Sequence, residues 1–284
     1  MDRLFIFFQH ITPQHLLSRC TGWLASMEHP AWFKNGLISA FVRHFQVAME
    51  EAQEPDMRRY ASFNAFFTRR LRDDARPMAE EGILCPADGA ISQLGPITDG
   101  LILQAKGRHY SVEDLLGGDL ERTAEFHGGQ FATVYLSPRD YHRIHMPVAG
   151  RLTGTCYIPG KLFSVNGVTA ENVDRLFARN ERLVCYFDTD HGPMAMVLVG
   201  AMIVAGIETV WAGRVAPPPR QPVTVDYRVA PEAVSLARGA EMGRFMLGST
   251  VILLFPEGTM TFDERFAAGV ATRMGEAMAR YCQS

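Results

Sequence analysis

From about residue 60 onward, the chain is a succession of short runs rich in Val, Ile, Leu, Tyr and Thr. Eight strand-like runs cover residues 101–105, 131–136, 151–158, 183–189, 194–204, 206–214, 222–228 and 250–255. Turn-forming pairs such as Asp88-Gly89 and Asp99-Gly100 separate several of them. Helical segments are expected around 111–116, 168–178 and 261–281, without regular alternation of strand and helix. The pattern predicts an α+β fold with mostly antiparallel β-sheets packed on each other and interspersed helices.

Residues 1–60 form a different part of the chain, dense in large apolar side chains. The uncharged stretch 4–18 contains Pro13 and several polar residues, so it is too short and too polar to span a bilayer. Two or three amphipathic helices fit better, with Pro13 and Pro30 near helix starts. The last helix carries an apolar stripe. The stripe consists of Phe33, Leu37, Phe41 and Phe45, with Ile38 and Val42 beside it.

This stripe has two interpretations. It packs on the protein's own core, or it lies in one leaflet of a membrane with Trp23 and Trp32 at headgroup depth. We favour the second, because the aromatic side chains exceed what three short helices need for packing. The expected organisation is an N-terminal membrane-associated part, 1–60, followed by one catalytic domain, 61–284.

Composition excludes several classes of protein. A net charge of −3 and a pI near 6.3 argue against nucleic-acid binding, which needs a concentrated basic face. The five cysteines are scattered, odd in number and form no CxxC pair, which favours reduced thiols over a disulfide framework or a zinc ribbon. Only three lysines are present, so a lysine imine has few candidates.

Polar residues with catalytic potential gather at three places. Asp88 lies in Pro86-Ala87-Asp88-Gly89, a sequence that also fits a plain hairpin turn. His142 and His145 lie within Tyr135 to Pro147, and their spacing would put them on one face of a helical turn. The pair is compatible with acid/base work, with structural histidines and with a metal site. A mononuclear zinc site lacks an obvious third ligand.

The third place is Leu247-Gly248-Ser249-Thr250, immediately before an apolar strand. Gly-Ser-Thr is ordinarily a turn, but Asp88, a histidine and Ser249 together have the residue types of a nucleophilic relay. In such a relay the serine hydroxyl could attack the carbonyl of Gly248, since glycine leaves that approach unhindered.

The sequence resembles a known family, the bacterial phosphatidylserine decarboxylases of the membrane-associated, pyruvoyl-dependent kind. The resemblance extends over nearly the whole length. Beside the aromatic N-terminus, its blocks are Pro86–Gly89, Tyr135–Pro147, Gly160–Asn166, Leu176–Arg182, Ile207–Gly213, Glu241–Phe245 and Leu247–Thr250. Many blocks in one order are specific, although no single block is.

The resemblance implies a self-cleavage relay of Asp88, His145 and Ser249, acting on the bond between Gly248 and Ser249. Acyl shift, β-elimination and loss of ammonia would leave a pyruvoyl group derived from Ser249, with no metal and no PLP. The products would be a large chain, 1–248, and a small chain, 249–284, held together by sheet pairing. Whether such heterodimers form a homodimer is left open.

The implied reaction is decarboxylation of phosphatidylserine to phosphatidylethanolamine through a Schiff base with the pyruvoyl ketone. His142 would donate the proton after decarboxylation or assist imine formation, or else position its loop. By resemblance only, Phe163, Ser164 and Asn166 line the serine headgroup. Candidate contacts to lipid phosphate are Arg139, Arg179 and Arg182.

The expected partners are phosphatidylserine and anionic membrane lipid, not nucleic acid, and the expected location is the cytoplasmic face of the cell membrane, peripherally bound. Three other functions are alternatives to phosphatidylserine decarboxylation. A conventional serine hydrolase would keep an intact chain and react with fluorophosphonates, and a lipid-binding scaffold would tolerate Ser249→Ala. A pyruvoyl decarboxylase acting on another serine phospholipid, such as an ether-linked one, is the nearest alternative.

Overall fold

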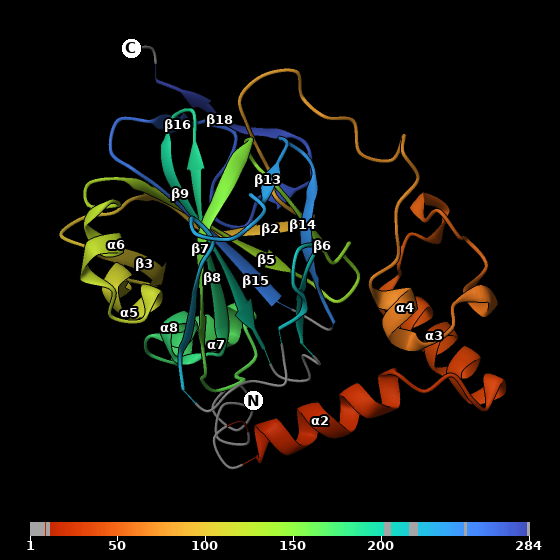
Figure 1. Cartoon of the computed structure of the whole chain (residues 1–284). Helices are drawn as coiled ribbons and strands as arrows, with labels where there is room; N and C mark the ends of the chain where they lie inside the picture. The colour runs from red at the N-terminus through yellow and green to blue at the C-terminus, as the bar shows by residue number, and fades with distance from the viewer. Residues whose placement is uncertain (1–8, 10–11, 202–205, 216–220, 247–248, 283–284) are drawn as a thin grey trace.

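A computed structural model describes residues 9, 12–201, 206–215, 221–246 and 249–282, and of Ser249 it describes the backbone only. Figure 1 shows a body of twisted β-sheets, with helices α2, α3 and α4 below and to one side and helices α5–α8 on the other. The α+β architecture with mostly antiparallel sheets is confirmed.

A nine-stranded antiparallel sheet forms the centre of the body. Its strands run in the order β12 (Val223–Asp226), β7 (Gly150–Ile158), β8 (Arg182–Thr189), β9 (Gly192–Gly200), β15 (Ser249–Phe255), β5 (Gln130–Leu136), β2 (Gly89–Pro96) and β17 (Ala271–Thr272), with β13 (Ser235–Leu236) also paired to β7. The strand that begins at Ser249 is therefore central in the sheet.

Three smaller sheets complete the β structure. One has the order β1 (Ile83–Leu84), β18 (Ala277–Tyr281) and β16 (Met260–Phe262), and another is the hairpin of β3 (Leu101–Ala105) and β4 (Arg108–Ser111). The third has the order β11 (Gly213–Arg214), β10 (Ile207–Thr209), β14 (Glu241–Phe245) and β6 (Arg143–His145). Strand β6 carries His145, and β14 leads toward the cleavage sequence.

Both faces of the central sheet are buried. Successive side chains of a strand point to opposite faces, and in β15 Val251 and Leu253 enter one apolar cluster while Ile252 and Leu254 enter another. The second cluster is covered by short helices. Helices α5 (Val112–Leu116), α7 (Gly167–Asn172) and α8 (Leu176–Arg179) contribute residues to it, and α6 (Leu120–Ala124) contacts α5. Burial on both faces explains why residues 251–255 read as an unbroken apolar run rather than an alternating one.

The N-terminal helices begin where the prolines predicted. Helix α2 (Gln14–Ala25) follows Pro13, and α3 (Ala31–Phe45) follows Pro30. Two 3₁₀ turns, η1 (Met49–Glu51) and η2 (Met57–Arg59), lead to α4 (Phe63–Phe67), where the Ser62 side chain accepts a hydrogen bond from the backbone N–H of Ala65.

The apolar stripe of α3 packs on the protein itself. Ile38 is fully buried, and Phe41 lies edge-on to Phe63, Phe66 and Phe67 of α4. The first interpretation of the stripe is therefore correct for these residues. Other large side chains of α2 and α3 face outward, with Trp23 69% and Trp32 75% exposed. Among the described helices, none combines the length and apolarity needed to cross a bilayer.

One predicted helix is wrong. Residues 261–281 form β16, β17 and β18 joined by turns, because Gly269 and Gly275 adopt positive φ angles of 88° and 91° that end any helix there. Within this stretch, β17 pairs with β2 and β18 pairs with β1. Of the predicted run 194–204, the strand β9 ends at Gly200, and residues 202–205 lie outside the described part.

Candidate active site

The backbone of Ser249 lies between two strands. It pairs with Leu136 of β5 on one side and with Gly200 of β9 on the other. Leu247 and Gly248, and hence the predicted cleavage bond, lie outside the described residues. The site is therefore defined by what surrounds the first residue of β15.

Beyond Leu136, the loop 137–142 carries His142. The predicted helical turn is wrong: His142 lies in the loop, and His145 lies in strand β6, so the two rings do not share a helix face. The backbone N–H of Phe245 donates to the His142 carbonyl, at 3.0 Å. The loop thus follows the residue that pairs with Ser249 and contacts the strand that precedes the cleavage sequence.

The His142 imidazole is completely buried. Its Nδ1 lies 2.8 Å from the Asp140 carbonyl, to which it must donate, and its ring lies 4.0 Å from the Phe67 ring, between centroids. Burial lowers the pKa of His142 to about 3, so the ring is neutral at neutral pH. Its Nε2 has no hydrogen-bond partner among the described residues. A buried, neutral ring with a free lone pair can exchange a proton with a ligand.

The His145 imidazole is held at both nitrogens. Nδ1 donates to the Gly239 carbonyl at 2.8 Å, so the neutral ring carries its lone pair on Nε2, where the Tyr141 hydroxyl lies 3.0 Å away. Burial lowers the pKa of His145 and keeps it neutral. The backbone N–H of His145 donates to the Pro86 carbonyl, two residues before Asp88.

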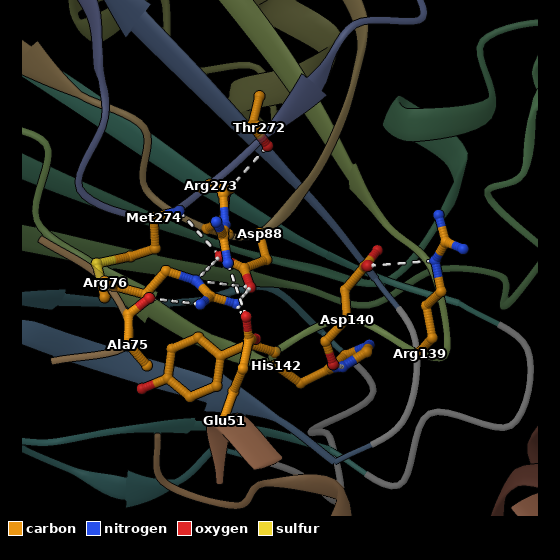
Figure 2. A network of polar contacts seen from close by, with 12 residues as sticks. Glu51, Ala75, Arg76, Asp88, Arg139, Asp140, His142, Thr272, Arg273 and Met274 are labelled. Atoms are coloured by element: carbon orange, nitrogen blue, oxygen red, sulfur yellow. Dashed lines mark hydrogen bonds and ion pairs between the residues drawn. The ribbon is translucent and has the colours of Figure 1, made fainter. Parts of the chain in front are cut away.

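Asp88 is buried in a network that sequence reasoning missed. The guanidinium of Arg76 donates from Nε to Asp88 Oδ1 at 2.9 Å and from Nη2 to Asp88 Oδ2 at 2.5 Å (Figure 2). The same Nη2 lies 2.7 Å from Glu51, which also pairs with Arg273. The backbone N–H of Met274 donates to Asp88 Oδ1. Arg76 had no local pattern that distinguished it within a charged stretch of sequence.

The glycine after Asp88 is required by the sheet. A Cβ at Gly89 would lie 2.2 Å from the carbonyl oxygen of Tyr135 in the adjacent strand. Asp88 thus enters β2 at the same end of the sheet at which β15 begins, since Ala90 pairs with Tyr135 and Ser249 with Leu136. Strands β2 and β15 flank β5, which places their backbones about 10 Å apart.

The three relay residues are gathered at one end of the sheet, but the described structure does not join them by hydrogen bonds. Asp88 is bonded to Arg76 and Met274, and His145 to Gly239 and Tyr141. The charge of Asp88 is nonetheless near enough to oppose, as a minor cause, the lowering of the His145 pKa by burial.

The predicted headgroup segment lies on the opposite side of Ser249. The amide of Asn180 donates to the carbonyls of Phe163 and Gly200, and Gly200 pairs with Ser249. Ser164 donates its backbone N–H to Gln9, and Asn166 caps α7 through its side chain. The N-terminal segment is thus attached to this loop.

The three arginines suggested for lipid phosphate differ in their surroundings. Arg182 is buried, and its guanidinium donates to backbone carbonyls that include those of Leu115 and Ala178, so it is a structural residue and not a lipid contact. Arg179 lies over the ring of Phe163 at 5.0 Å, and Arg139 lies on the surface, 3.8 Å from Asp140. Among the described residues, no group of three or more His, Cys, Asp or Glu side chains is placed to hold a metal ion.

Comparison with known proteins shows the family of the chain. A family model described as phosphatidylserine decarboxylase matches residues 63–280, and a second, described as PSD, matches residues 4–46. The chain belongs to the phosphatidylserine decarboxylase family. This confirms the resemblance inferred from the sequence blocks and makes the chain a member of a family of carboxy-lyases.

Individual members of the family match over their full length. The phosphatidylserine decarboxylase proenzyme of Pseudomonas aeruginosa (strain LESB58) is 59% identical over 286 residues, covering 100% of this chain and 99% of that protein. The proenzyme of Azotobacter vinelandii (strain DJ / ATCC BAA-1303) is 59% identical, and that of Pseudomonas putida (strain W619) is 58% identical, each covering 98% of both chains.

Proposed function

We propose that this chain cleaves itself between Gly248 and Ser249 and then decarboxylates phosphatidylserine to phosphatidylethanolamine. The observation that carries the proposal is the position of Ser249. It begins the central strand of a sheet, in a family whose relatives are called proenzymes. The loop that follows its pairing strand β5 carries a buried neutral imidazole and contacts β14, which precedes the cleavage sequence.

In this proposal His145 is the base for self-cleavage. Its Nδ1–H is fixed on Gly239, so Nε2 is the nitrogen that can take the Ser249 hydroxyl proton, once the Tyr141 hydroxyl yields that position. Asp88, held by Arg76, supplies negative charge near the imidazolium that then forms. The two chains produced would be 1–248 and 249–284.

The surroundings of Ser249 fit a pyruvoyl group. The residue begins a strand that both neighbours hold by backbone pairing, so cleavage would leave the new N-terminus in place. The group would supply an electron-accepting carbonyl for the loss of CO₂ from the substrate. His142 Nε2, buried and unpartnered among the described residues, would accept a proton from the substrate ammonium and then return it to the α-carbon that has lost its carboxylate.

The exposed face of α2 and α3 supports peripheral binding to the membrane. Leu16, Trp23 and Trp32 are more than half exposed, although α2 is attached to the protein body through Gln14 and His15. Tryptophan is suited to the membrane–water interface because its ring is amphipathic. We propose that these side chains hold the 160–166 loop near anionic lipid at the cytoplasmic face of the cell membrane, with Phe163, Ser164 and Asn166 next to the headgroup.

Intact mass under denaturing conditions tests the proposal. Active protein should give two chains, the smaller beginning at residue 249 with a ketone in place of its amine. Ser249→Ala should give one uncut and inactive chain, whereas Ser92→Ala, at a serine of β2 outside the proposed machinery, should be cut normally. A single uncut chain in active protein would refute the mechanism.

A further inference from the structure

A cavity of about 450 Å³ lies between the α4 region and the strands β6 and β14. Its wall includes four arginines, Arg69, Arg70, Arg143 and Arg244, together with Glu54 and Met246. Met246 is the second residue before Gly248, so the cavity adjoins the proposed cleavage bond along the chain. Its volume is in the range of pockets that hold small ligands.

The wall of this arginine pocket is strongly basic. Arg143 pairs with Glu241, and Arg244 pairs with Glu208, so their charges are partly offset. The one acidic residue of the wall, Glu54, pairs with Arg59. That leaves Arg69 and Arg70, which form no ion pair with a described residue. A pocket with this balance favours an anion.

Arg69 carries the argument furthest, because it is 4% exposed. Its Nη2 donates to the carbonyls of Arg139 at 3.1 Å and Asp140 at 3.4 Å, while Nε and Nη1 have no partner among the described residues. Burial of an unpaired cation is costly, and burial lowers the pKa of Arg69. The unpartnered N–H groups of Nε and Nη1 lie on opposite edges of the guanidinium, so each can donate singly to a phosphate oxygen but the two do not form one bidentate pair.

The pocket and the proposed active site share one hydrogen-bond acceptor, the carbonyl oxygen of Asp140. The Asp140 carbonyl accepts hydrogen bonds both from Arg69 Nη2 and from His142 Nδ1. In phosphatidylserine, one oxygen and one methylene separate the phosphorus from the α-carbon that loses CO₂. An anion on Arg69 would therefore be a near neighbour of His142, as the substrate requires.

We propose that the arginine pocket binds the phosphodiester of the substrate headgroup, with Arg69 as its principal contact. This rests on the proposed function and names the part of the substrate that the pocket recognises. Arg69, Arg143 and Arg244 surround the phosphate, and the serine carboxylate and amine extend toward His142 and residue 249.

Steady-state kinetics on soluble dihexanoyl phosphatidylserine test this assignment. Arg69→Gln should raise KM roughly ten- to hundredfold, the effect of losing hydrogen bonds to a charged group, and should change kcat by less than about threefold. Arg69→Lys, which keeps the charge without the fork, should be intermediate. Arg151→Gln, at an exposed arginine of β7 paired with Asp188, is the matched control and should leave KM unchanged.

A binding measurement covers variants that mature poorly. Glycerophosphoserine should bind the wild-type enzyme in calorimetry, compete with substrate, and lose its binding in Arg69→Gln. Inorganic phosphate should compete more weakly. If inorganic phosphate binds at Arg69 and glycerophosphoserine does not, the pocket serves free phosphate and the proposal is wrong.

Three other outcomes would overturn the proposal. An unchanged KM in matured Arg69→Gln, or a fall in kcat alone, would make Arg69 a support for the His142 loop. Loss of pelleting on phosphatidylglycerol vesicles with normal kinetics on soluble substrate would assign the pocket to bulk lipid. Each failure leaves chain cleavage and decarboxylation intact, so it is distinct from failure of the proposed function.

Discussion

At the scale of single residues, Arg76 is the side chain on which the conformation of Asp88 depends. It contributes charge-assisted hydrogen bonds to Asp88 and to Glu51, and both Arg76 and Asp88 are at most 10% exposed in this pair. Removing one member of a buried ion pair leaves the other charge uncompensated. The Asp88 loop is therefore held by a residue from the segment that follows α4.

We expect Arg76→Gln to lower the free energy of unfolding by about 3–5 kcal/mol. Urea denaturation in the uncut Ser249→Ala background measures this without interference from chain cleavage. Arg108→Gln removes an exposed pair with Asp174 and should cost less than about 1 kcal/mol. Equal losses in the two variants would show that the Arg76 pair is not a buried support.

His142 should make stability depend on pH. Its pKa is about 3 in the folded chain, where burial lowers it, and near 6.5 when unfolded. The unfolded state therefore binds the additional proton between these values, and stability falls as pH drops from about 6.5 toward 3. From pH 7 to pH 5 the loss attributable to His142 is about 2 kcal/mol.

His142→Asn should remove most of that loss, because asparagine can still donate to the Asp140 carbonyl but does not titrate. Urea denaturation at pH 7 and pH 5, again in the Ser249→Ala background, compares the two slopes. An unchanged pH dependence in His142→Asn would mean that the ring is not buried in its neutral form.

At the scale of elements, the side chains of α2 and α3 proposed to bind the membrane differ from those that hold the helices to the protein. Trp23 of α2 and Trp32 of α3 are exposed, whereas Phe41 of α3 packs on α4. Replacing the two tryptophans should therefore leave the helices folded. Burial of a large apolar side chain contributes about 1.5–3 kcal/mol, so Trp23→Gln with Trp32→Gln should weaken vesicle binding tenfold or more.

Sedimentation with vesicles containing phosphatidylglycerol measures this change, and circular dichroism checks the fold. Leu120→Gln is the control, because Leu120 is 68% exposed on α6, on the other side of the sheets from α3 (Figure 1). If both changes weaken binding alike, the membrane face does not lie on α2 and α3.

These elements show what the sequence could and could not predict. Pro13 and Pro30 placed helix starts correctly because the effect of proline on the backbone is local. Residues 261–281 were misread because their helix-favouring composition is overridden by two glycines and by pairing with β1 and β2. The direction of the α3 stripe was misread because α4, which covers it, contributes its aromatics from a separate segment.

The residues of the candidate site were predictable from the sequence, but their contacts were not. Sequence motifs brought attention to Asp88, His142, His145 and Ser249, and the fold gathers their segments at one end of the central sheet. The partners of these residues were not predictable. Arg76 and Arg69 gain their importance from burial and from contacts made across the fold, and both occur in arginine-rich sequence without a distinguishing spacing.

At the scale of the whole molecule, the proposed cleavage divides a chain without dividing its core. The small chain would contain β15, β16, β17 and β18. Strand β15 pairs with β5 and β9 along its length, β17 pairs with β2, and β18 pairs with β1. Arg273 adds an ion pair to Glu51. The two chains would thus share one folded unit.

Sharing one folded unit has a thermodynamic consequence. Unfolding of the matured protein releases two chains, so its midpoint in urea should rise with protein concentration. Unfolding of uncut Ser249→Ala is a reaction of a single chain, and its midpoint should not depend on concentration if no further assembly contributes. Denaturation monitored at protein concentrations that differ a hundredfold distinguishes the two forms. A concentration-independent midpoint for cleaved protein would mean that the small chain remains bound in the denatured state, contrary to an association built from sheet pairing and buried side chains.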